Sequence, residues 1–465
     1  RGTEIILHIA EDSTEFLEEA RIRTLLMKYN KFMPIPIKFG MKTETLPKPE
    51  DAKEEDAAPT KEVDNIINNP SPAWTKQPSE LKDEDYSGFY RELYPMQFEE
   101  PLFNIHLNVD YPFNLTGILY FPKMNKDMQI QKDKIQLYQN QVFVTDNVEG
   151  IVPEFLTMLR GVIDSPDIPL NVSRSYLQAD GAVKKISSYI TRKVGDKLKS
   201  LFNDNREEFN AKWDDIKIVI EYGMLTEDKF FDKAQDFMLY PTVDGNYHTF
   251  AELKEKLAAA QTDKDDKLVL LYASNKEEQH SYIAAAKDKG YEVLLLDSPI
   301  ISHLIQKMET SQEKISFARV DGDHIDNLIK KDEEAISKLS DQEKETLKTF
   351  LTDTIPAEKF SVQLEAMDSK SNPFIITEPE FMRRMKEMQQ NGGGGGMFGM
   401  GNMPDMYNLI VNTNHELVTE ILNTKTAKKK ERLVNQALDL AKLSKGLLKG
   451  EDMTAFINRS YEMIK

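Results

Sequence analysis

The sequence predicts a multidomain protein of the α/β class that ends in a pair of helices. The chain has 465 residues, which is room for about three domains of ~150 residues each. A strand–helix–strand pattern over residues 267–296 predicts parallel strands with a helix between them. Two amphipathic helical patterns close the chain and indicate a helical hairpin. We therefore expect a region of two α/β lobes joined by helices, followed by a C-terminal α+β domain.

Composition narrows the classes of function. The chain has 60 Lys and Arg against 78 Asp and Glu, a net charge of -18, which disfavours a nucleic-acid partner. It has no cysteine, which excludes disulfides and Cys-ligated metals and fits a reducing cytoplasm. None of its seven histidines lies three or four residues from another, so we expect no metal site. No apolar run approaches the ~20 residues of a membrane span, so we expect no membrane partner.

The first residues predict a small piece of structure that needs a larger neighbour. Ile5–Ile9 is typical of a short strand, and Asp12 with Glu15 resembles a capping box for a helix over Ser13–Tyr29. The apolar side chains of that helix point in several directions, which favours burial by a larger domain over a simple extension. About 35 residues cannot supply that larger domain alone, so we expect a domain upstream. Lys42–Asp64 is charged and Pro-containing, and indicates an extended linker.

The central region contains the clearest strand. Phe103–Val109 alternates apolar and polar residues, which predicts a half-buried strand. Gly117–Phe121 and Gln141–Thr145 indicate further strands, and Pro153–Ile163 indicates a helix. In the strand–helix–strand unit, Gly290 ends the helix. The unit lacks the G-x-G-x-x-G pattern, so we do not expect a dinucleotide site.

The C-terminal region alternates helices and strands before the final hairpin. Asp332–Asp353 is helical in character, Phe374–Met388 predicts a strand followed by a helix, and Tyr407–Val411 predicts a strand. The five glycines at 392–396 lack the G-K-[ST] ending of a phosphate loop and indicate a hinge. The hairpin's apolar stripe needs a partner, which is either its own domain or a dimeric four-helix bundle. The residues of that stripe that we assign to dimerisation are Leu433, Ala437, Leu438, Ala441, Phe456 and Ile457.

A methionine-rich segment precedes and follows the glycines. Its seven methionines are spaced by multiples of three, and phenylalanines lie among them. Flexible, polarisable Met side chains suit a surface that re-packs against many partners. Ordinary core packing would explain the methionines before the glycines, but not those among Gly, Asn and Pro. The members of this segment are Phe381, Met382, Met385, Met388, Met397, Phe398, Met400, Met403 and Met406.

A loop and helix start over Asp167–Gln178 form the last candidate. Ser173 is a good N-cap, and Arg174 and Gln178 lie four residues apart on one helix face. A cation at such a turn could reach an anion, although a surface ion pair is the simpler interpretation of the residues alone.

Several motifs together resemble the ninety-kilodalton heat-shock chaperone family, in its bacterial HtpG-type branch. The resemblance covers nearly the whole chain, and the L-N-V-S-R stretch after G-V-I-D-S is highly specific. The motifs that carry it are Arg1–His8 (R-G-T-E-I-I-L-H), Phe16–Glu19 (F-L-E-E), Pro72–Thr75 (P-A-W-T), Gly88–Tyr90 (G-F-Y), Gly161–Ser165 (G-V-I-D-S), Leu170–Arg174 (L-N-V-S-R) and Gly290–Leu296 (G-Y-E-V-L-L-L).

The resemblance implies a three-part machine. Residues 1–39 would be the trailing strand and helix of an N-terminal Bergerat-fold ATPase domain, and 40–68 a charged linker. Residues 69–328 would be the middle domain, and 329–465 the dimerisation domain. The cofactor would be ATP with Mg²⁺ in the intact protein. We expect none bound to this chain, because the motifs that form most of the nucleotide pocket are absent from it.

The resemblance also implies residue roles. Gly2 and Thr3 would lie near the nucleotide phosphates, Arg174 would contact the γ-phosphate as a catalytic residue, and Gln178 would steady that contact. His303 stands where bacterial relatives can have a client-facing Trp, so that contact is weakened or moved.

The function implied by the resemblance is an ATP-dependent, homodimeric chaperone that binds and remodels non-native client proteins. Clients would touch the middle domain and the methionine-rich segment, and other chaperones are further candidate partners. The chain lacks the M-E-E-V-D tail of eukaryotic cytosolic members, so we expect no docking through such a tail. The competing class is a nucleotide-independent holdase or protein-interaction scaffold.

Overall fold

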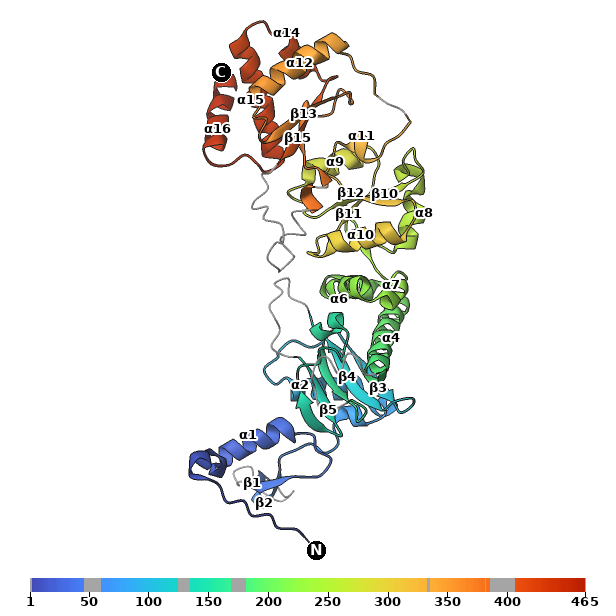
Figure 1. The fold of residues 1–465 in the computed structure, drawn as a ribbon, viewed down its shortest axis with the longest axis vertical. Helices are drawn as coiled ribbons and strands as arrows, with labels where there is room; N and C mark the ends of the chain where they lie inside the picture. The colour runs from blue at the N-terminus through green and yellow to red at the C-terminus, as the bar shows by residue number, and fades with distance from the viewer. Residues whose placement is uncertain are drawn as a thin grey trace, which may run out of the picture. The chain divides into compact units, whose positions relative to one another are not determined.

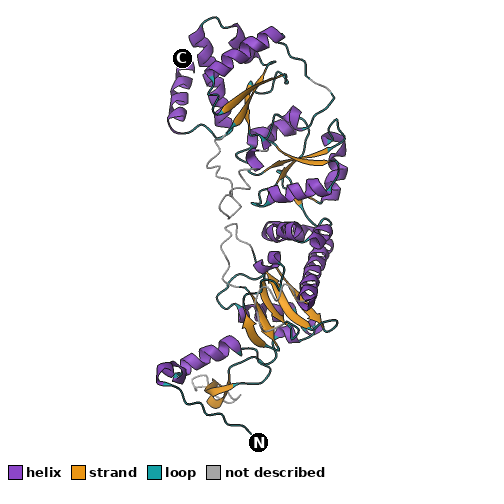
Figure 2. Ribbon diagram, in the orientation of Figure 1, coloured by secondary structure: helices purple, strands orange, loops and turns teal. Residues whose placement is uncertain are grey.

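The computed structural model describes residues 2–45, 60–123, 134–168, 181–332, 335–380, 382–384 and 406–464. Contacts between residues divide the chain into two compact units, residues 1–234 and residues 235–465 (Figure 1). Both units combine helices with sheets, so the expected α/β class is confirmed (Figure 2).

The first unit holds a hairpin, a five-stranded sheet and a set of helices. In chain order its elements are η1 (Glu11–Leu17), α1 (Glu19–Tyr29), β1 (Lys38–Thr45), β2 (Thr60–Ile66), η2 (Ala73–Thr75), η3 (Pro78–Glu80), α2 (Asp83–Leu93), β3 (Phe103–Val109), β4 (Leu115–Phe121), β5 (Ile135–Gln139), β6 (Val142–Thr145), η4 (Glu154–Met158), β7 (Arg160–Asp164), α4 (Gly181–Asp204), α5 (Arg206–Ala211), α6 (Trp213–Thr226) and α7 (Asp228–Ala234).

The five-stranded sheet has the strand order β3-β4-β7-β5-β6. The predicted strand Phe103–Val109 is confirmed at the edge of this sheet, antiparallel to β4. Strands β4 and β7 are buried along almost their whole length, because both lie between neighbours and are covered on their faces. Helix α4 contacts β3, and Figure 1 shows it alongside that strand.

The N-terminal expectations were partly wrong. Ile5–Ile9 forms no strand, and its apolar side chains Ile5, Ile6 and Leu7 are exposed. Instead of one helix from Ser13, a 3-10 turn η1 precedes α1, because Ser13 has non-helical backbone angles. No side-chain cap forms at the start of either element, so the predicted capping box is wrong.

The segment expected as an extended linker contains paired strands at both ends. Strands β1 and β2 form an antiparallel hairpin over Lys38–Thr45 and Thr60–Ile66, and residues 46–59 lie outside the described part of the chain. Opposite charges face each other across the hairpin, with Glu44 opposite Lys61. Such cross-strand pairs stabilise a hairpin without burying apolar side chains, which is why composition alone indicated a linker.

The predicted helix at Pro153–Ile163 was also wrong. Its first half is the 3-10 turn η4, and its second half is strand β7. Val162 and Ile163 are β-branched and fully buried between β4 and β5, where a strand suits them better than a helix.

The second unit contains a parallel α/β lobe and a mixed C-terminal sheet with helices. Its elements are β8 (Tyr240–Pro241), β9 (Tyr247–His248), α8 (Phe250–Gln261), β10 (Leu268–Ala273), α9 (His280–Asp288), β11 (Val293–Leu295), α10 (Ile301–Ser311), β12 (Ile315–Arg319), α11 (Ile325–Leu328), α12 (Asp341–Thr354), β13 (Phe360–Glu365), β14 (Phe374–Thr377), β15 (Tyr407–Asn412), α14 (Glu416–Asn423), α15 (Ala427–Ser444) and α16 (Gly450–Ile464).

The strand–helix–strand prediction in this unit is confirmed. Strand β10 pairs in parallel with both β11 and β12. Helix α9 begins at His280, and the side chain of Gln279 just before it accepts hydrogen bonds from the backbone N–H groups of Ser274 and Asn275, which holds a turn there. Gly290 follows the helix with φ of +76°, the left-handed conformation that favours glycine at a helix end.

The C-terminal sheet and hairpin share one core. The sheet order is β13-β15-β14, and helices α12, α14 and α15 contribute to the same buried cluster. Helix α15 buries Val434, Ala437, Leu438 and Ala441 in this core. Helix α16 has no buried residue, although it follows α15 as the second arm of the predicted hairpin.

Candidate functional site

Three of the motifs that carry the family resemblance meet in one aromatic core of the first unit. Trp74 is fully buried, its indole N–H donates to the Asp164 carboxylate at 3.3 Å, and its ring lies 5.4 Å from that of Phe89. Asp164 also accepts a 2.8 Å hydrogen bond from the backbone N–H of Gln141. Burial raises the pKa of Asp164, and these hydrogen bonds oppose the rise. These motif residues therefore hold the fold together.

The residues expected at the nucleotide are not brought together by the described structure. Gly2 and Thr3 lie in an exposed segment without helix or strand, and a Cβ added to Gly2 would meet nothing within 4 Å. Arg174 and Gln178 lie outside the described residues, and the next element, α4, begins at Gly181. Of the four residues assigned to the nucleotide, the described structure therefore places only Gly2 and Thr3.

The residues expected to face clients are only partly described. His303 is half-buried on α10, and Met382 is half-buried in a short helical turn after β14. Met406 is exposed immediately before β15. The others, Phe381, Met385, Met388, Met397, Phe398, Met400 and Met403, lie outside the described part of the chain.

The six residues assigned to dimerisation fall into two groups. Ala437, Leu438 and Ala441 are buried in the core of their own unit, and Leu433 packs partly against it. This half of the stripe is therefore used inside the protomer. Phe456 and Ile457 lie on α16, which buries no residue in the described structure.

Helix α16 is attached to α15 by polar contacts and leaves an apolar row uncovered. Arg459 donates to Gln436 at 2.7 Å and forms an ion pair with Asp439, which fixes the side of α16 that faces α15. Ile457, Tyr461 and Ile464 follow at helical spacing and are 43%, 66% and 82% exposed.

Helix α15 adds apolar surface next to that contact. Leu440 and Leu443 are exposed large apolar residues. Their spacing from Gln436, four and seven residues, places them on the same side of α15 as the residues that bind α16. We call five of the exposed apolar side chains on these two helices the hairpin face; its members are Leu440, Leu443, Ile457, Tyr461 and Ile464.

A buried ionic cluster joins the α/β lobe to the hairpin within the second unit. Asp321, whose side chain is 3% exposed, accepts hydrogen bonds from Arg319 at 2.5 Å and from Gln279 at 2.8 Å, and forms an ion pair with Lys445 at the end of α15. Arg319 also pairs with Glu378 at 2.9 Å. Burial opposes ionisation of Asp321, but the two cations together hold its pKa below the usual range.

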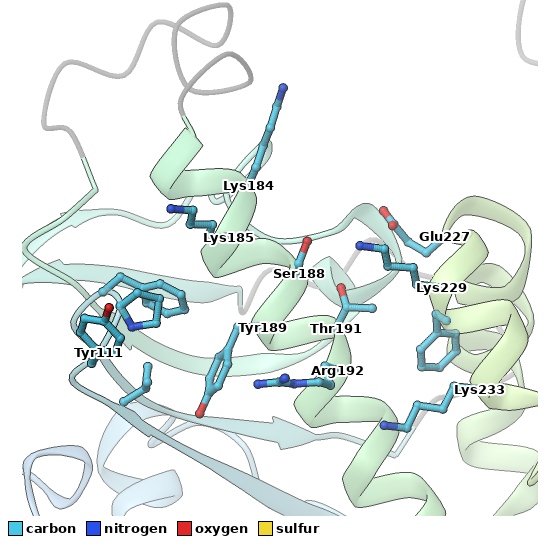
Figure 3. A pocket seen from close by; sticks show the side chains of 14 residues that line it. Tyr111, Lys184, Lys185, Ser188, Tyr189, Thr191, Arg192, Glu227, Lys229 and Lys233 are labelled. Carbon is cyan, nitrogen blue, oxygen red and sulfur yellow. The ribbon is translucent and has the colours of Figure 1, made fainter.

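A cavity of about 690 Å³, which was not predicted from the sequence, lies in the first unit (Figure 3). Its cationic side chains come from α4 and α7, and its apolar wall comes from the turn between β3 and β4. Lys184, Ser188 and Arg192 are four residues apart on one face of α4, a spacing that could have indicated a basic helix face. Because the α7 residues of the lining lie far from this helix face in the sequence, the spacing alone does not indicate that they share a cavity.

The described part of the chain holds no cluster of side chains suited to a metal ion. Among the same residues, no helix is both long and apolar enough to span a bilayer.

Comparison with known proteins gives the class and the family. The family model described as Hsp90 protein matches residues 47–465. The chaperone protein HtpG of Bacteroides fragilis is 46% identical, over 100% of this chain and 76% of its own length. Those of Porphyromonas gingivalis and Bacteroides thetaiotaomicron are both 51% identical, over 91% and 92% of this chain and 61% and 62% of their own lengths.

These matches define a molecular chaperone of the bacterial HtpG type. The chain belongs to the Hsp90 protein family. It spans between 61% and 76% of the length of these relatives.

Proposed function

We propose that this chain serves an ATP-dependent, homodimeric chaperone that holds and remodels non-native client proteins in the cytoplasm. The observation that carries the proposal beyond family membership is the hairpin face. A folded unit with a well-packed core nevertheless exposes a row of large apolar side chains on its last helix. Large apolar side chains exposed in a row along one helix mark an interaction site, and a second copy of the same hairpin would complete a four-helix bundle.

The hairpin face makes a direct prediction about self-association. Ile457→Glu should weaken the dimer by about a hundredfold or more, because a symmetric interface carries the change twice and each buried isoleucine contributes ~1.5–3 kcal/mol. Sedimentation velocity across a concentration series measures the shift to monomer.

The matched control is Ala455→Glu, which adds the same charge to the same helix two residues away, at an exposed position on its other side. The control should remain dimeric. A parent chain that sediments as a monomer, or equal weakening by both changes, would show that the hairpin face is not the interface.

The ATP part of the proposal rests on family membership and on Arg174. The cofactor would be ATP with Mg²⁺, and a bound nucleotide would supply the energy for opening and closing the dimer. Arg174→Ala in the intact protein should lower ATP turnover by about a hundredfold, because a cation near the transferring phosphoryl group stabilises its developing charge. ATP affinity should change little, since the residue acts mainly on the transition state.

Steady-state hydrolysis and equilibrium nucleotide binding measure these two quantities separately. Arg174→Lys is the companion variant, because it keeps the charge but loses the planar two-point contact of the guanidinium group. Unchanged turnover in Arg174→Ala would favour a nucleotide-independent holdase or scaffold instead.

A further inference from the structure

The cavity of the first unit combines a cationic rim with an apolar wall. Lys184, Lys185 and Arg192 project from α4, and Lys229 and Lys233 come from α7 (Figure 3). Glu227 is the one carboxylate in the lining. Five cations against one carboxylate reverse the sign of the surface locally, in a chain whose net charge is -18.

The cations are partly held in place by the protein. Lys233 forms an ion pair with Asp196, and the guanidinium of Arg192 lies 5.5 Å from the ring centroid of Tyr189. Lys184, Lys185, Arg192 and Lys229 are exposed to solvent. They can therefore contact a charged ligand without a large rearrangement of the fold.

The apolar wall lies at the turn between β3 and β4. It is formed by Val109, Pro112 and Phe113, with Tyr189 of α4 opposite Phe113 at a ring separation of 5.6 Å. Tyr111 at the tip of the turn is 85% exposed. A small inorganic anion would use the cations and leave this wall in water, so the lining fits a ligand that carries both carboxylates and apolar groups.

We propose that this cavity binds extended polypeptide segments that are rich in Asp and Glu and contain an aromatic or aliphatic residue. The carboxylates would contact the α4 and α7 cations, and the apolar side chain would pack on the β3–β4 turn. The volume of the cavity lies within the range of ligand-binding cavities. The proposal deepens the proposed function, on which it rests, by assigning one class of client segment to one site.

Charge complementarity decides between candidate occupants. At physiological ionic strength fixed charges act over only ~8 Å, so the cations of the cavity, and not the distant negative surface, set the local attraction. A polynucleotide backbone extends beyond the cavity and would meet the negative charge of the remaining chain. A short acidic peptide with an apolar anchor avoids that repulsion.

The test measures fluorescence anisotropy of labelled twelve-residue peptides with the purified chain. One peptide alternates Asp and Glu with Phe and Leu, the second replaces each acidic residue with Lys, and the third replaces Phe and Leu with Ala. We expect only the first to bind well, with affinity falling as salt is raised. The double variant K184E/R192E should weaken it at least tenfold.

The matched control variant is K76E/K197E, which changes net charge equally within the same unit but alters no residue that lines the cavity. It should bind the acidic peptide within twofold of the parent chain. Circular dichroism checks that both variants remain folded, which their exposed or half-exposed positions favour.

Four outcomes overturn the proposal. They are equal weakening by both double variants, equal binding of the Lys peptide, equal binding of the Ala peptide, and full competition by tripolyphosphate at the peptide's own affinity. Equal binding of the Ala peptide would show that the apolar wall is not used, and full competition by tripolyphosphate would show that the cavity recognises anions without a polypeptide. Suppression of aggregation of a heat-unfolded protein reports the proposed function separately, so a chain that suppresses aggregation but ignores the acidic peptide refutes only this assignment.

Discussion

Asp321→Asn is expected to destabilise the second unit by about 3–5 kcal/mol. The side chain of Asp321 is almost fully buried, and its loss of charge leaves Lys445, whose side chain is 10% exposed, without its partner. Removing one member of a buried ion pair costs this much because the remaining charge stays out of water uncompensated. The free-energy cost at Arg319 is smaller, because its guanidinium group keeps the ion pair with Glu378.

The measurement can be confined to one unit. Both tryptophans of the chain, Trp74 and Trp213, lie in the first unit. Tryptophan fluorescence should therefore show the same unfolding transition in the variant and the parent, while circular dichroism shows an early loss of helix. The control is Glu420→Gln, which removes a partner from the exposed pair with Lys429 and should cost at most ~0.5 kcal/mol.

The same carboxylate predicts a dependence on pH. The pKa of Asp321 is held below its usual value near 3.9, so its ionised form stabilises the fold above that pH. The contribution fades as the pH falls from about 4 through the lower value in the folded protein. The parent chain should therefore lose more stability than Asp321→Asn between pH 5 and pH 2. A constant difference between the two across that range would contradict the assigned role.

Gly161→Ala is expected to destabilise the first unit by about 3 kcal/mol or more. Gly161 has φ of +130°, which L side chains rarely adopt, and a Cβ there would lie 2.0 Å from the carbonyl oxygen of Ile118. Strain in the backbone and overpacking against the neighbouring strand each cost of the order of 1–3 kcal/mol. Its backbone N–H also donates to the hydroxyl of Tyr94 at 2.7 Å, which limits any shift of the strand.

Tryptophan fluorescence against denaturant measures this loss directly, because Trp74 lies in the same core. Gly88→Ala is the matched control: the position is an exposed site in α2, and an added Cβ meets nothing within 4 Å. There alanine should be neutral or stabilise by up to ~1 kcal/mol, since it favours a helix. Equal effects at the two glycines would contradict the packing argument.

Local patterns predicted the elements that depend on local physics. The alternation in Phe103–Val109 and the glycine after α9 were sufficient, because burial of one face and a left-handed helix end leave direct traces in sequence. Ile5–Ile9 has the composition of a strand but finds no partner strand among the described residues. Residues 153–163 form a turn and a strand instead of the predicted helix, because pairing of β7 with β4 and β5 on either side outweighs the local preference.

For the candidate sites too, the features that depend on local sequence were predictable and those that depend on distant segments were not. The helices of the hairpin were predictable from periodicity. Which of their residues are buried in the core of the same protomer was not predictable, because that core includes a sheet whose strands lie elsewhere in the chain. The family motifs were recognised from the sequence. The hydrogen bond between Trp74 and Asp164, which lie 90 residues apart, was not predictable, and it gives these two motif residues a role in stabilising the fold. The cationic cavity needed α4, α7 and the β3–β4 turn to come together, which no single stretch of sequence encodes.

The contact between Lys445 and Asp321 spans 124 residues of chain and connects the turn after α15 to the end of β12. It joins the hairpin to the α/β lobe of the same unit. The hydroxyl groups of Ser281 on α9 and Ser444 on α15 lie 2.9 Å apart and join the same two parts, so a displacement of α15 would reach the α/β lobe through these contacts as well as along the intervening chain. Of the two contacts only the one to Asp321 is ionic, so replacing this buried carboxylate should loosen the coupling between the hairpin and the α/β lobe more than removing either hydroxyl group.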